Sequence, residues 1–394
     1  MPYYSGKRMT YHYFVDFHTA ILEKVYCFLP ELLPVLNAIF ILIFALSVYS
    51  LARENGRRAA TIATVVATFG WGFSYVSLFS SLTSGQSNVS HNYMYQYDGL
   101  FGLPPIFDNL LQQRPLLNGL PAFALVLALL KNMEDENRIL LVGVITGLLF
   151  PFHSISFFCC YVAYFVSVLL NIKRFRISYL YFLVPSVATL PFVLSAEAAA
   201  SISFGDAWAY TFIKENPIYY YVLKLGIPFL ISLISLVELG HKLLNGAFVI
   251  LFLIPNFILL TPNTWDMYKF LIFSWVPIAV LTGIALARTI KSIALVLILL
   301  SILASASVVI YDLGTNYPAA SWDEYNLGVW VRENTPQKSV FLTYYSIHSP
   351  PIMVGGRERV LSYLTGPTVM DSPLTTFGSA PMTLTVRSTV AKTT

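Results

Sequence analysis

The side chains that can do chemistry gather between long apolar runs and in the C-terminal tail. They combine carboxylates with imidazole, ammonium and guanidinium groups: His12, Asp16, His18, His91, Asp98, Asp108, Arg114, His153, Asp206, Asp266, Lys269, Arg357 and Glu358. A carboxylate can act as a general base on a hydroxyl, and Arg or Lys can neutralise a phosphate leaving group where water meets a membrane. These residue types suit a reaction on a lipid-phosphate substrate.

The segment before the first apolar run carries the candidate catalytic base, Asp16. It lies in the stretch Tyr11–His18, where the helical period of about 3.6 residues places His12 and Asp16 on one face. That face is either the polar side of an interfacial helix, with Tyr and His at headgroup depth, or part of a reactive site with His12 in contact with substrate.

Two further candidates for substrate binding stand at the ends of apolar runs. Arg114 directly precedes Pro115 and an apolar run, so it is either a snorkelling anchor or a phosphate ligand. His153 lies in Pro151-Phe152-His153-Ser154 between two runs, where a buried imidazole needs a hydrogen-bonding partner. It is either a site residue or a structural histidine.

Cations and one carboxylate near later runs complete the candidate set. Asp266 and Lys269 occupy a short turn between two runs, either as substrate-binding residues or as an i,i+3 ion pair that caps a helix. Lys224 is the cation well inside a run, and we expect it to reach the outer end of its helix by snorkelling. Arg357, in the tail, is a candidate phosphate ligand.

The elements that must position these residues are membrane helices. The chain has 394 residues, of which 56% are hydrophobic and only 11% charged, and its mean hydropathy is +0.67. Several apolar runs have the length of about 17 to 23 residues that a helix needs to cross a bilayer. The crossings we expect are 30–52, 59–82, 115–130, 139–151, 154–172, 178–196, 218–240, 246–262, 270–288 and 292–312.

Basic residues predict the orientation of these crossings. They follow every second run: Arg53, Arg57, Arg58, Lys131, Arg138, Lys173, Arg174, Arg176, His241, Lys242, Arg288 and Lys291. Connections rich in Lys and Arg stay in the cytoplasm, so the candidate residues and both termini are expected on the other side of the cell membrane. A single kinked helix over 139–172 would invert the later alternation, and the charges favour two crossings.

The fold class we expect is an all-α polytopic membrane protein with a small C-terminal α/β soluble segment. The expected parts are an external interfacial segment (1–29), a multi-pass membrane domain (30–312), an external α/β segment (313–364) and a disordered tail (365–394). In the α/β segment, Ser321 and Glu324 form a capping box for a helix that ends near Asn334. We expect a buried strand over Ser339–Thr343 and a second strand over Arg359–Leu364.

The expected orientation places residues 1–29 outside although they contain Lys7 and Arg8 and follow no apolar run. Translocation of such a tail without a helix before it is unusual. We therefore expect that the chain lacks an upstream membrane helix, and an in-frame apolar run encoded before Met1 would support this.

Several short motifs spread over nearly the whole chain carry a resemblance to a known family. They are Tyr11-His12-Tyr13 with Asp16, Gln113-Arg114, Pro151-Phe152-His153-Ser154, Trp265-Asp266 with Lys269, and Trp330–Pro336 followed by Ser339–Thr343 and Gly356-Arg357. With them the chain resembles the GT-C superfamily of polytopic glycosyltransferases, in particular uncharacterised archaeal and bacterial membrane proteins of that type.

The resemblance implies an inverting glycosyltransferase with a polyprenyl-phosphate sugar donor, an active site at the outer membrane face and a catalytic Asp in the first external loop. The implied roles are Asp16, or an Asp upstream, as the base; Arg114, Lys269 and Arg357 as phosphate ligands; and His153 and Asp266 as residues that shape the pocket. The tail also resembles the start of the soluble domain of oligosaccharyltransferase subunits. The Trp-Trp-Asp-Tyr-Gly signature of those enzymes is absent, and Tyr344–Ile347 stands roughly in its place.

Two other classes of function fit the sequence. A solute transporter would use broken helices at the prolines within the runs, and a non-catalytic membrane scaffold would need no reactive residues. Membrane lipid and the lipid-phosphate donor are the expected partners. The cations fall in short clusters, which argues against nucleic acid, and no oligomeric state is predicted. No cofactor is evident, and the carboxylates are too scattered to define a divalent metal site.

Overall fold

The computed structural model describes residues 14–26, 29–84, 103–189, 208–213, 216–237, 239–260, 264–314, 320–343 and 349–360. The chain divides into two compact units, which are described separately. Residues 10–317 form the helical unit, and residues 318–394 belong, with 1–9, to the C-terminal unit.

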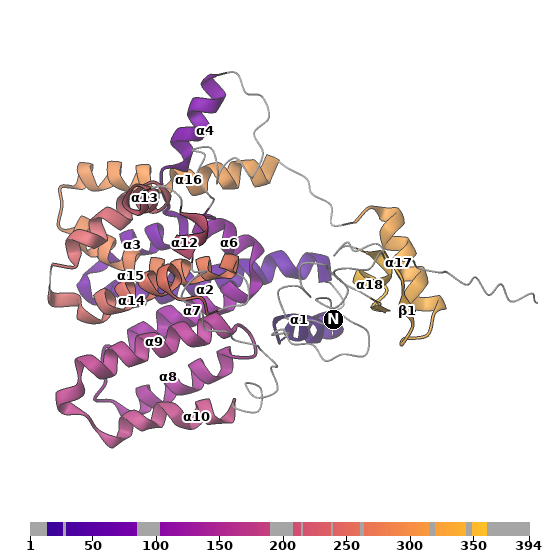
Figure 1. Ribbon diagram of the computed structural model, residues 1–394, viewed down its shortest axis with the longest axis horizontal. Coiled ribbons are helices and arrows are strands. Elements are labelled where there is room, and N and C mark those ends of the chain that lie inside the picture. Colours follow the sequence, from indigo (N-terminus) through magenta and orange to yellow (C-terminus); the bar gives the residue numbers. More distant parts are fainter. Residues whose placement is uncertain are drawn as a thin grey trace, which may run out of the picture. The chain divides into compact units, whose positions relative to one another are not determined.

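The helical unit consists of helices throughout its described part (Figure 1). The α-helices are α1 (Phe14–Tyr26), α2 (Leu29–Ala52), α3 (Arg57–Phe69), α4 (Ser74–Thr83), α6 (Ile106–Gln112), α7 (Arg114–Leu129), α8 (Glu136–Leu149), α9 (Ser154–Leu170), α10 (Leu183–Ala188), α12 (Trp208–Phe212), α13 (Pro217–Ser235), α14 (Lys242–Phe257), α15 (Tyr268–Ala287) and α16 (Lys291–Gly314). Short 3-10 helices are η1 (Arg53–Asn55), η2 (Ile172–Arg174), η3 (Ile177–Phe182), η4 (Leu239–His241) and η5 (Thr264–Met267).

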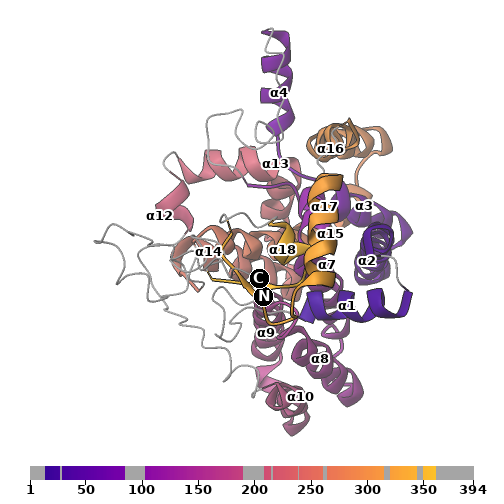
Figure 2. The ribbon, with the colours of Figure 1, turned by 90° about the vertical axis from the view of Figure 1, so that its right-hand side faces the viewer.

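Helix α15 forms the centre of the helical unit. Nearly all its residues are buried, and α3, α13, α14 and α2 pack against it (Figure 1, Figure 2). A helix that is apolar on every side must be enclosed by other helices. By contrast, α2 and α16 expose large apolar side chains such as Leu42, Leu46, Leu295 and Val296. Those faces need an apolar environment outside the protein.

Four described segments are long and apolar enough to cross a membrane: Pro34–Asn55, Pro217–Ser235, Thr264–Ala287 and Lys291–Ile310. A fifth is the pair α3 and α4, which is bent by 56° at a short break. Helices α7, α9 and α14 are apolar but shorter. Each of the ten predicted crossings contains helix, although for 178–196 the described part ends at Thr189.

The predicted choice between one and two helices over 139–172 is settled by the turn at Pro151–His153. Helix α8 ends at Leu149, the His153 backbone N–H donates to the Leu149 carbonyl (2.7 Å), and α9 begins at Ser154. The two helices pack against each other (Figure 2). They form a hairpin, as the charge pattern favours.

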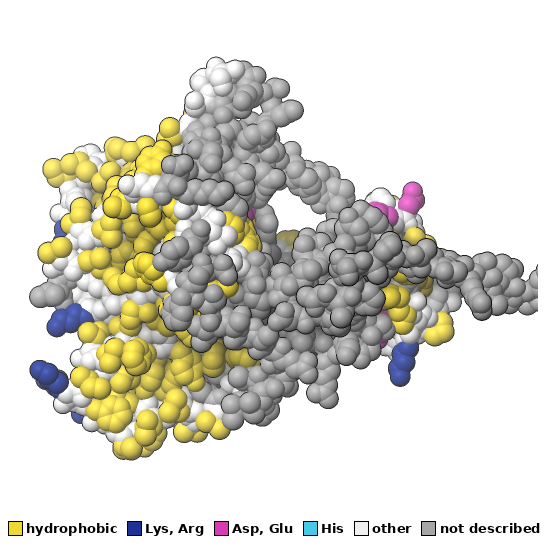
Figure 3. Space-filling view, viewed as in Figure 1, with side chains coloured by type: hydrophobic (Ala, Val, Ile, Leu, Met, Phe, Trp, Pro, Cys, Tyr) yellow, Lys and Arg dark blue, Asp and Glu magenta, His cyan; other side chains and the backbone are white. Residues whose placement is uncertain are grey.

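The C-termini of α2, α7 and α15 lie together at what we call the basic end. Lys131, just after α7, donates to the Leu51 carbonyl of α2 and to Glu54, both at 2.5 Å. Arg58, in the first turn of α3, donates to the Ala287 carbonyl at the end of α15 (3.1 Å). Cations at helix C-termini satisfy terminal carbonyls and oppose the helix dipole. In Figure 3, Lys and Arg side chains of the helical unit gather at its left-hand edge, beside a broad hydrophobic surface.

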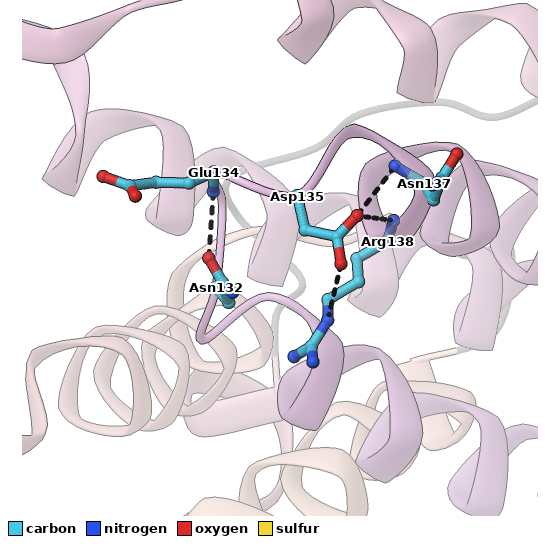
Figure 4. Close-up of polar contacts among 5 residues, drawn as sticks. All are labelled: Asn132, Glu134, Asp135, Asn137 and Arg138. Atoms are coloured by element: carbon cyan, nitrogen blue, oxygen red, sulfur yellow. Dashed lines mark hydrogen bonds and ion pairs between the residues drawn. The ribbon is translucent and has the colours of Figure 1, made fainter.

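The connection from α7 to α8 turns the chain round at this end (Figure 4). The Asp135 carboxylate caps α8, because its Oδ1 accepts from the backbone N–H groups of Asn137 (3.0 Å) and Arg138 (3.3 Å). Its Oδ2 accepts from Arg138 Nε (3.1 Å), and Asn132 Oδ1 accepts from the Glu134 N–H (3.2 Å). The anion suits the positive end of the helix dipole and offsets the Arg138 charge locally.

Two broken helices meet inside the helical unit. The break between α3 and α4 contains Gly72, and α13 is kinked at Gly226, whose φ is 65°. The Phe73 N–H donates to the Leu223 carbonyl (2.8 Å), and a Cβ at Gly72 would lie 2.3 Å from that carbonyl oxygen. Beyond the break, α4 projects away from the bundle (Figure 1, Figure 2). Backbone contact this close requires glycine at position 72.

The C-terminal unit contains α17 (Trp322–Asn334), α18 (Pro350–Met353) and two short strands that pair in parallel, β1 (Val340–Phe341) and β2 (Glu358–Arg359). The capping box is confirmed: Ser321 Oγ accepts from the Glu324 N–H (3.2 Å), and Glu324 Oε2 accepts from the Ser321 N–H (2.8 Å). The predicted burial of Ser339–Thr343 is wrong, since Val340 is 47% exposed. A two-stranded ribbon of this size has no second layer to cover that face.

Gly72→Ala tests the contact between the two breaks. The new Cβ must displace the Leu223 and Lys224 backbone, so we expect a loss of stability of about 1–3 kcal/mol, the usual cost of overpacking. Thermal unfolding in detergent, followed by size-exclusion chromatography, measures it. Gly240→Ala is the control, because nothing lies within 4 Å of its Cβ position. Equal unfolding midpoints for Gly72→Ala and Gly240→Ala would contradict the close approach.

Candidate functional site

Three helices begin at the end of the helical unit opposite the basic end. They are α7, α9 and α15, which pack against one another. The ends of α7 and α15 are held at the basic end, and Ser167, near the end of α9, donates to the Leu130 carbonyl after α7 (3.2 Å). The three helices therefore run in the same direction. Their N-termini carry partial positive charge, so together they favour an anion.

Asp16 and Arg114 lie close to each other at this end. Helix α1 meets the turn between α8 and α9, where the Phe14 N–H donates to the Pro151 carbonyl (3.4 Å) and the Phe14 and Phe152 rings are 5.8 Å apart. Asp16, in the first turn of α1, is exposed. Burial lowers the pKa of Arg114, and attraction to the Asp16 carboxylate opposes that shift by raising it. The carboxylate of the candidate base therefore favours the charged form of this candidate phosphate ligand.

His153 is buried beneath them, in the angle between α7, α9 and α15. Its Nδ1 lies 2.6 Å from Ser156 Oγ, and its ring stacks on Phe273 of α15 with 6.4 Å between centroids. A Cβ at Gly119 of α7 would lie 1.8 Å from Ser156 Oγ, so glycine makes room for this contact. His153 thus contacts α15 through Phe273, and Ser156 is the hydrogen-bonding partner that a buried imidazole needs.

Asp266 and Lys269 form the i,i+3 ion pair that the sequence allows, with 2.6 Å between Oδ1 and Nζ. The Lys269 side chain is only 10% exposed, and Asp266 is 36% exposed. Tyr268, between them, donates from its hydroxyl to Asn109 Oδ1 of α6 (2.9 Å). Because α6 leads directly into Arg114, this bond connects the start of α15 to the start of α7.

We call Asp16, Arg114, Asp266 and Lys269 the rim. Aromatic side chains adjoin its Asp266 side: the Trp265 ring lies 5.7 Å from Trp208 and 5.1 Å from Tyr268. Trp208 and Tyr268 are buried, so these rings pack around the start of α15 and hold it in place. No sequence pattern singles out Trp208 or Asn109, which lie far from Trp265 and Tyr268 in the chain. Tyr268 stands within the Trp265–Lys269 motif and could have been selected.

Arg357 has a different role from the one expected. Its guanidinium is buried and donates to the carbonyls of Arg332 (2.5 Å), Thr335 (2.7 Å) and Gly355 (2.9 Å), and to Thr335 Oγ1 (2.9 Å). Arg357 thereby satisfies the C-terminal carbonyls of α17 within its own unit. A guanidinium directed at these carbonyls is not available to a phosphate, so we leave Arg357 out of the candidate site.

Other candidates lie elsewhere. His12, His91, Asp98 and Asp206 fall outside the described residues. Lys224 was expected to reach the outer end of its helix, but it is 2% exposed and lies beside the Gly226 kink. Packing against the second broken helix encloses it, which hydropathy alone does not predict.

The described residues contain no group of three or more His, Cys, Asp or Glu side chains that could hold a metal ion. Cys159 and Cys160 are buried free thiols in α9. Comparison with known proteins gives no match: no family model, no curated protein and no solved structure matches the chain. The chemistry of the rim therefore has to be argued from its own residues.

Tyr268→Phe tests the link between α6 and α15. It keeps the ring and leaves the buried Asn109 oxygen without this donor, so we expect a loss of about 1–3 kcal/mol of stability. The unfolding midpoint measures it, with Tyr219→Phe, at an exposed position of α13, as the control. If both variants unfold at the wild-type temperature, the bond does not hold α15 to α6.

Proposed function

We propose that this protein is a multi-pass membrane glycosyltransferase of the GT-C type. It transfers a sugar from a polyprenyl-phosphate-linked donor to an acceptor on the non-cytoplasmic side of the cell membrane. One observation carries the proposal: the exposed carboxylate Asp16 is close enough to Arg114 for their charges to interact, at the end of the bundle where three apolar helices begin. A base for the acceptor and a positive environment for the leaving phosphate then occur together at the edge of an apolar bundle.

The proposed topology has about ten crossings, with the basic end in the cytoplasm. The described helices support it through their direction, because α7, α9 and α15 all begin at the rim and end at the basic end. In this topology α2, α7, α9, α13 and α15 enter from outside, and the helices between them return. The rim then lies at the outer membrane face, where a polyprenyl chain can stay in lipid while its phosphate reaches Arg114.

The proposed reaction is a single displacement with inversion at the anomeric carbon. Asp16 accepts the proton of the acceptor hydroxyl as the oxygen bonds to the anomeric carbon. The bond from that carbon to the phosphate oxygen breaks, and its electron pair stays on the lipid phosphate. Arg114 and the helix N-termini stabilise the charge that develops there. Every atom lost by the donor thus appears in the product or in the lipid phosphate.

The remaining rim residues have supporting roles. Lys269 and Asp266 form an ion pair at the start of α15, which holds the ammonium group in place at 2.6 Å. His153 lies at the start of α9, where it bonds to Ser156 and stacks on Phe273 of α15. Preorganised charge of this kind needs no rearrangement when the phosphate leaves.

Asp16→Asn tests the role of the base. Loss of a general base costs about 100- to 10,000-fold in rate. Transfer of radiolabelled sugar from polyprenyl-phosphate donors, in vesicles containing the full chain, is the measurement. Asp135→Asn is the matched control: asparagine also caps helices well, and residue 135 lies at the opposite end. If the wild-type chain transfers no sugar from any polyprenyl-phosphate donor tested, the proposed function is wrong.

Arg114→Gln tests the phosphate ligand separately from the base. A hydrogen bond to a charged group contributes about 1.5–3 kcal/mol, so kcat/KM for the donor should fall by about ten- to hundredfold. The variant Arg138→Gln removes one charge at the basic end and should leave transfer unchanged. Equal activity of Arg114→Gln and the wild-type protein would exclude Arg114 from the site.

Solute transport is the second candidate, and the meeting of the two broken helices favours it. Transporters bind substrates at discontinuous helices in the bundle interior, and buried Lys224 lies beside the kink in α13. Flux of labelled solutes into the vesicles used for the transfer assay separates the two functions. Flux without sugar transfer would favour the transporter.

A further inference from the structure

The connection between α9 and α10 carries three cations that the proposed function does not use. Lys173, Arg174 and Arg176 occupy η2 and the residues before η3, and all three are exposed. Exposed apolar side chains alternate with them: Ile172 is 56% exposed and Phe175 is 50% exposed. Cations and apolar groups therefore share one surface at the basic end.

These cations have no acidic partners in the described part of the chain. No Asp or Glu occurs anywhere between Glu136 and Glu197. Two other cations at the basic end are paired with carboxylates, Lys131 with Glu54 and Arg138 with Asp135. The cluster at 173–176 is left as an uncompensated positive surface, which attracts an anion from outside the protein.

The 3-10 geometry of η3 and the start of α10 separates an inner face from an outer one. With about three residues per turn, side chains at i and i+3 lie above one another. Tyr179 and Phe182 point inward and are buried. Ile177 (71% exposed), Leu180 (44%) and Leu183 (44%) form an outer stripe that starts next to Arg176.

The inner face holds this segment rigidly against α8 and α9. The Phe182 ring stacks on Tyr164 of α9, with 3.9 Å between centroids and 7° between planes. The Tyr164 hydroxyl donates to the Tyr179 carbonyl. In α8, a Cβ at Gly143 would lie 2.6 Å from the Phe182 carbonyl oxygen, so glycine allows the close approach. The cations and the outer stripe are presented on a fixed support.

We infer that this surface binds an acidic phospholipid of the membrane. Its phosphate contacts Lys173, Arg174 and Arg176, and one acyl chain lies along Ile177, Leu180 and Leu183. Arginine suits phosphate because its guanidinium can donate two parallel hydrogen bonds. Each Lys or Arg near an anionic membrane surface favours binding by about fivefold. The inference requires the bundle to lie in a membrane, and it holds whether or not the rim transfers sugar.

Lipid retention tests the inference. The full-length protein is reconstituted in bilayers of equal phosphatidylglycerol and phosphatidylcholine, extracted in mild detergent, and its retained lipids are counted by mass spectrometry. We expect phosphatidylglycerol to exceed phosphatidylcholine by at least about fivefold. The variant K173Q/R174Q/R176Q should abolish this preference. Its elution and unfolding midpoint should not change, because the three side chains are exposed.

The matched control removes the same charge from other exposed cations at the basic end, in R53Q/R57Q/K291Q. It should retain the preference for phosphatidylglycerol. A second variant, I177S/L180S, keeps every charge and should weaken lipid retention at least twofold through the acyl chain alone. Equal loss in the 173–176 variant and in the charge control, or no preference in the wild-type protein, would overturn the inference.

Discussion

The common direction of α7, α9 and α15 is the constraint on which the rest of the structure depends. All three pack against one another, and hydrogen bonds at the basic end hold their C-termini together. Their N-termini then carry Arg114, His153 and Lys269 to one end, while Lys131 is held at the other. Polar and charged groups that are far apart in the sequence thereby meet at one end of the bundle, next to the carboxylate of α1.

The sequence predicted this fold best where a single local rule decides the outcome. Hydropathy located the helices, the spacing of Ser321 and Glu324 predicted the cap of α17, and the spacing of Asp266 and Lys269 allowed their ion pair. It failed where a tertiary contact decides. The role of Arg357 depends on carbonyls 22 to 26 positions away in the chain. The burial of Lys224 depends on packing against a second broken helix.

The charged side chains at the two ends of the helical unit have different partners. At the rim, Arg114 and the pair formed by Asp266 and Lys269 stand over a buried polar contact between His153 and Ser156. At the basic end, Lys131 and Arg58 donate to carbonyls at helix C-termini, and the cations at 173–176 have no acidic partner among the described residues. In the proposed reaction, the helix N-termini at the rim stabilise the negative charge of the leaving phosphate. In the inferred lipid site, the cations at the basic end bind an anionic membrane surface.

Labelling of single cysteines in intact cells tests most directly whether the rim residues share one side of the membrane. Cys27 is replaced by serine, the buried Cys159 and Cys160 are kept, and cysteine is introduced at Asp16, Asp266, Glu54 or Asp135 in turn. An impermeant maleimide should label positions 16 and 266 in intact cells, and positions 54 and 135 only after permeabilisation. Labelling of 16 and 266 from opposite sides would contradict a shared site and the proposed reaction with it.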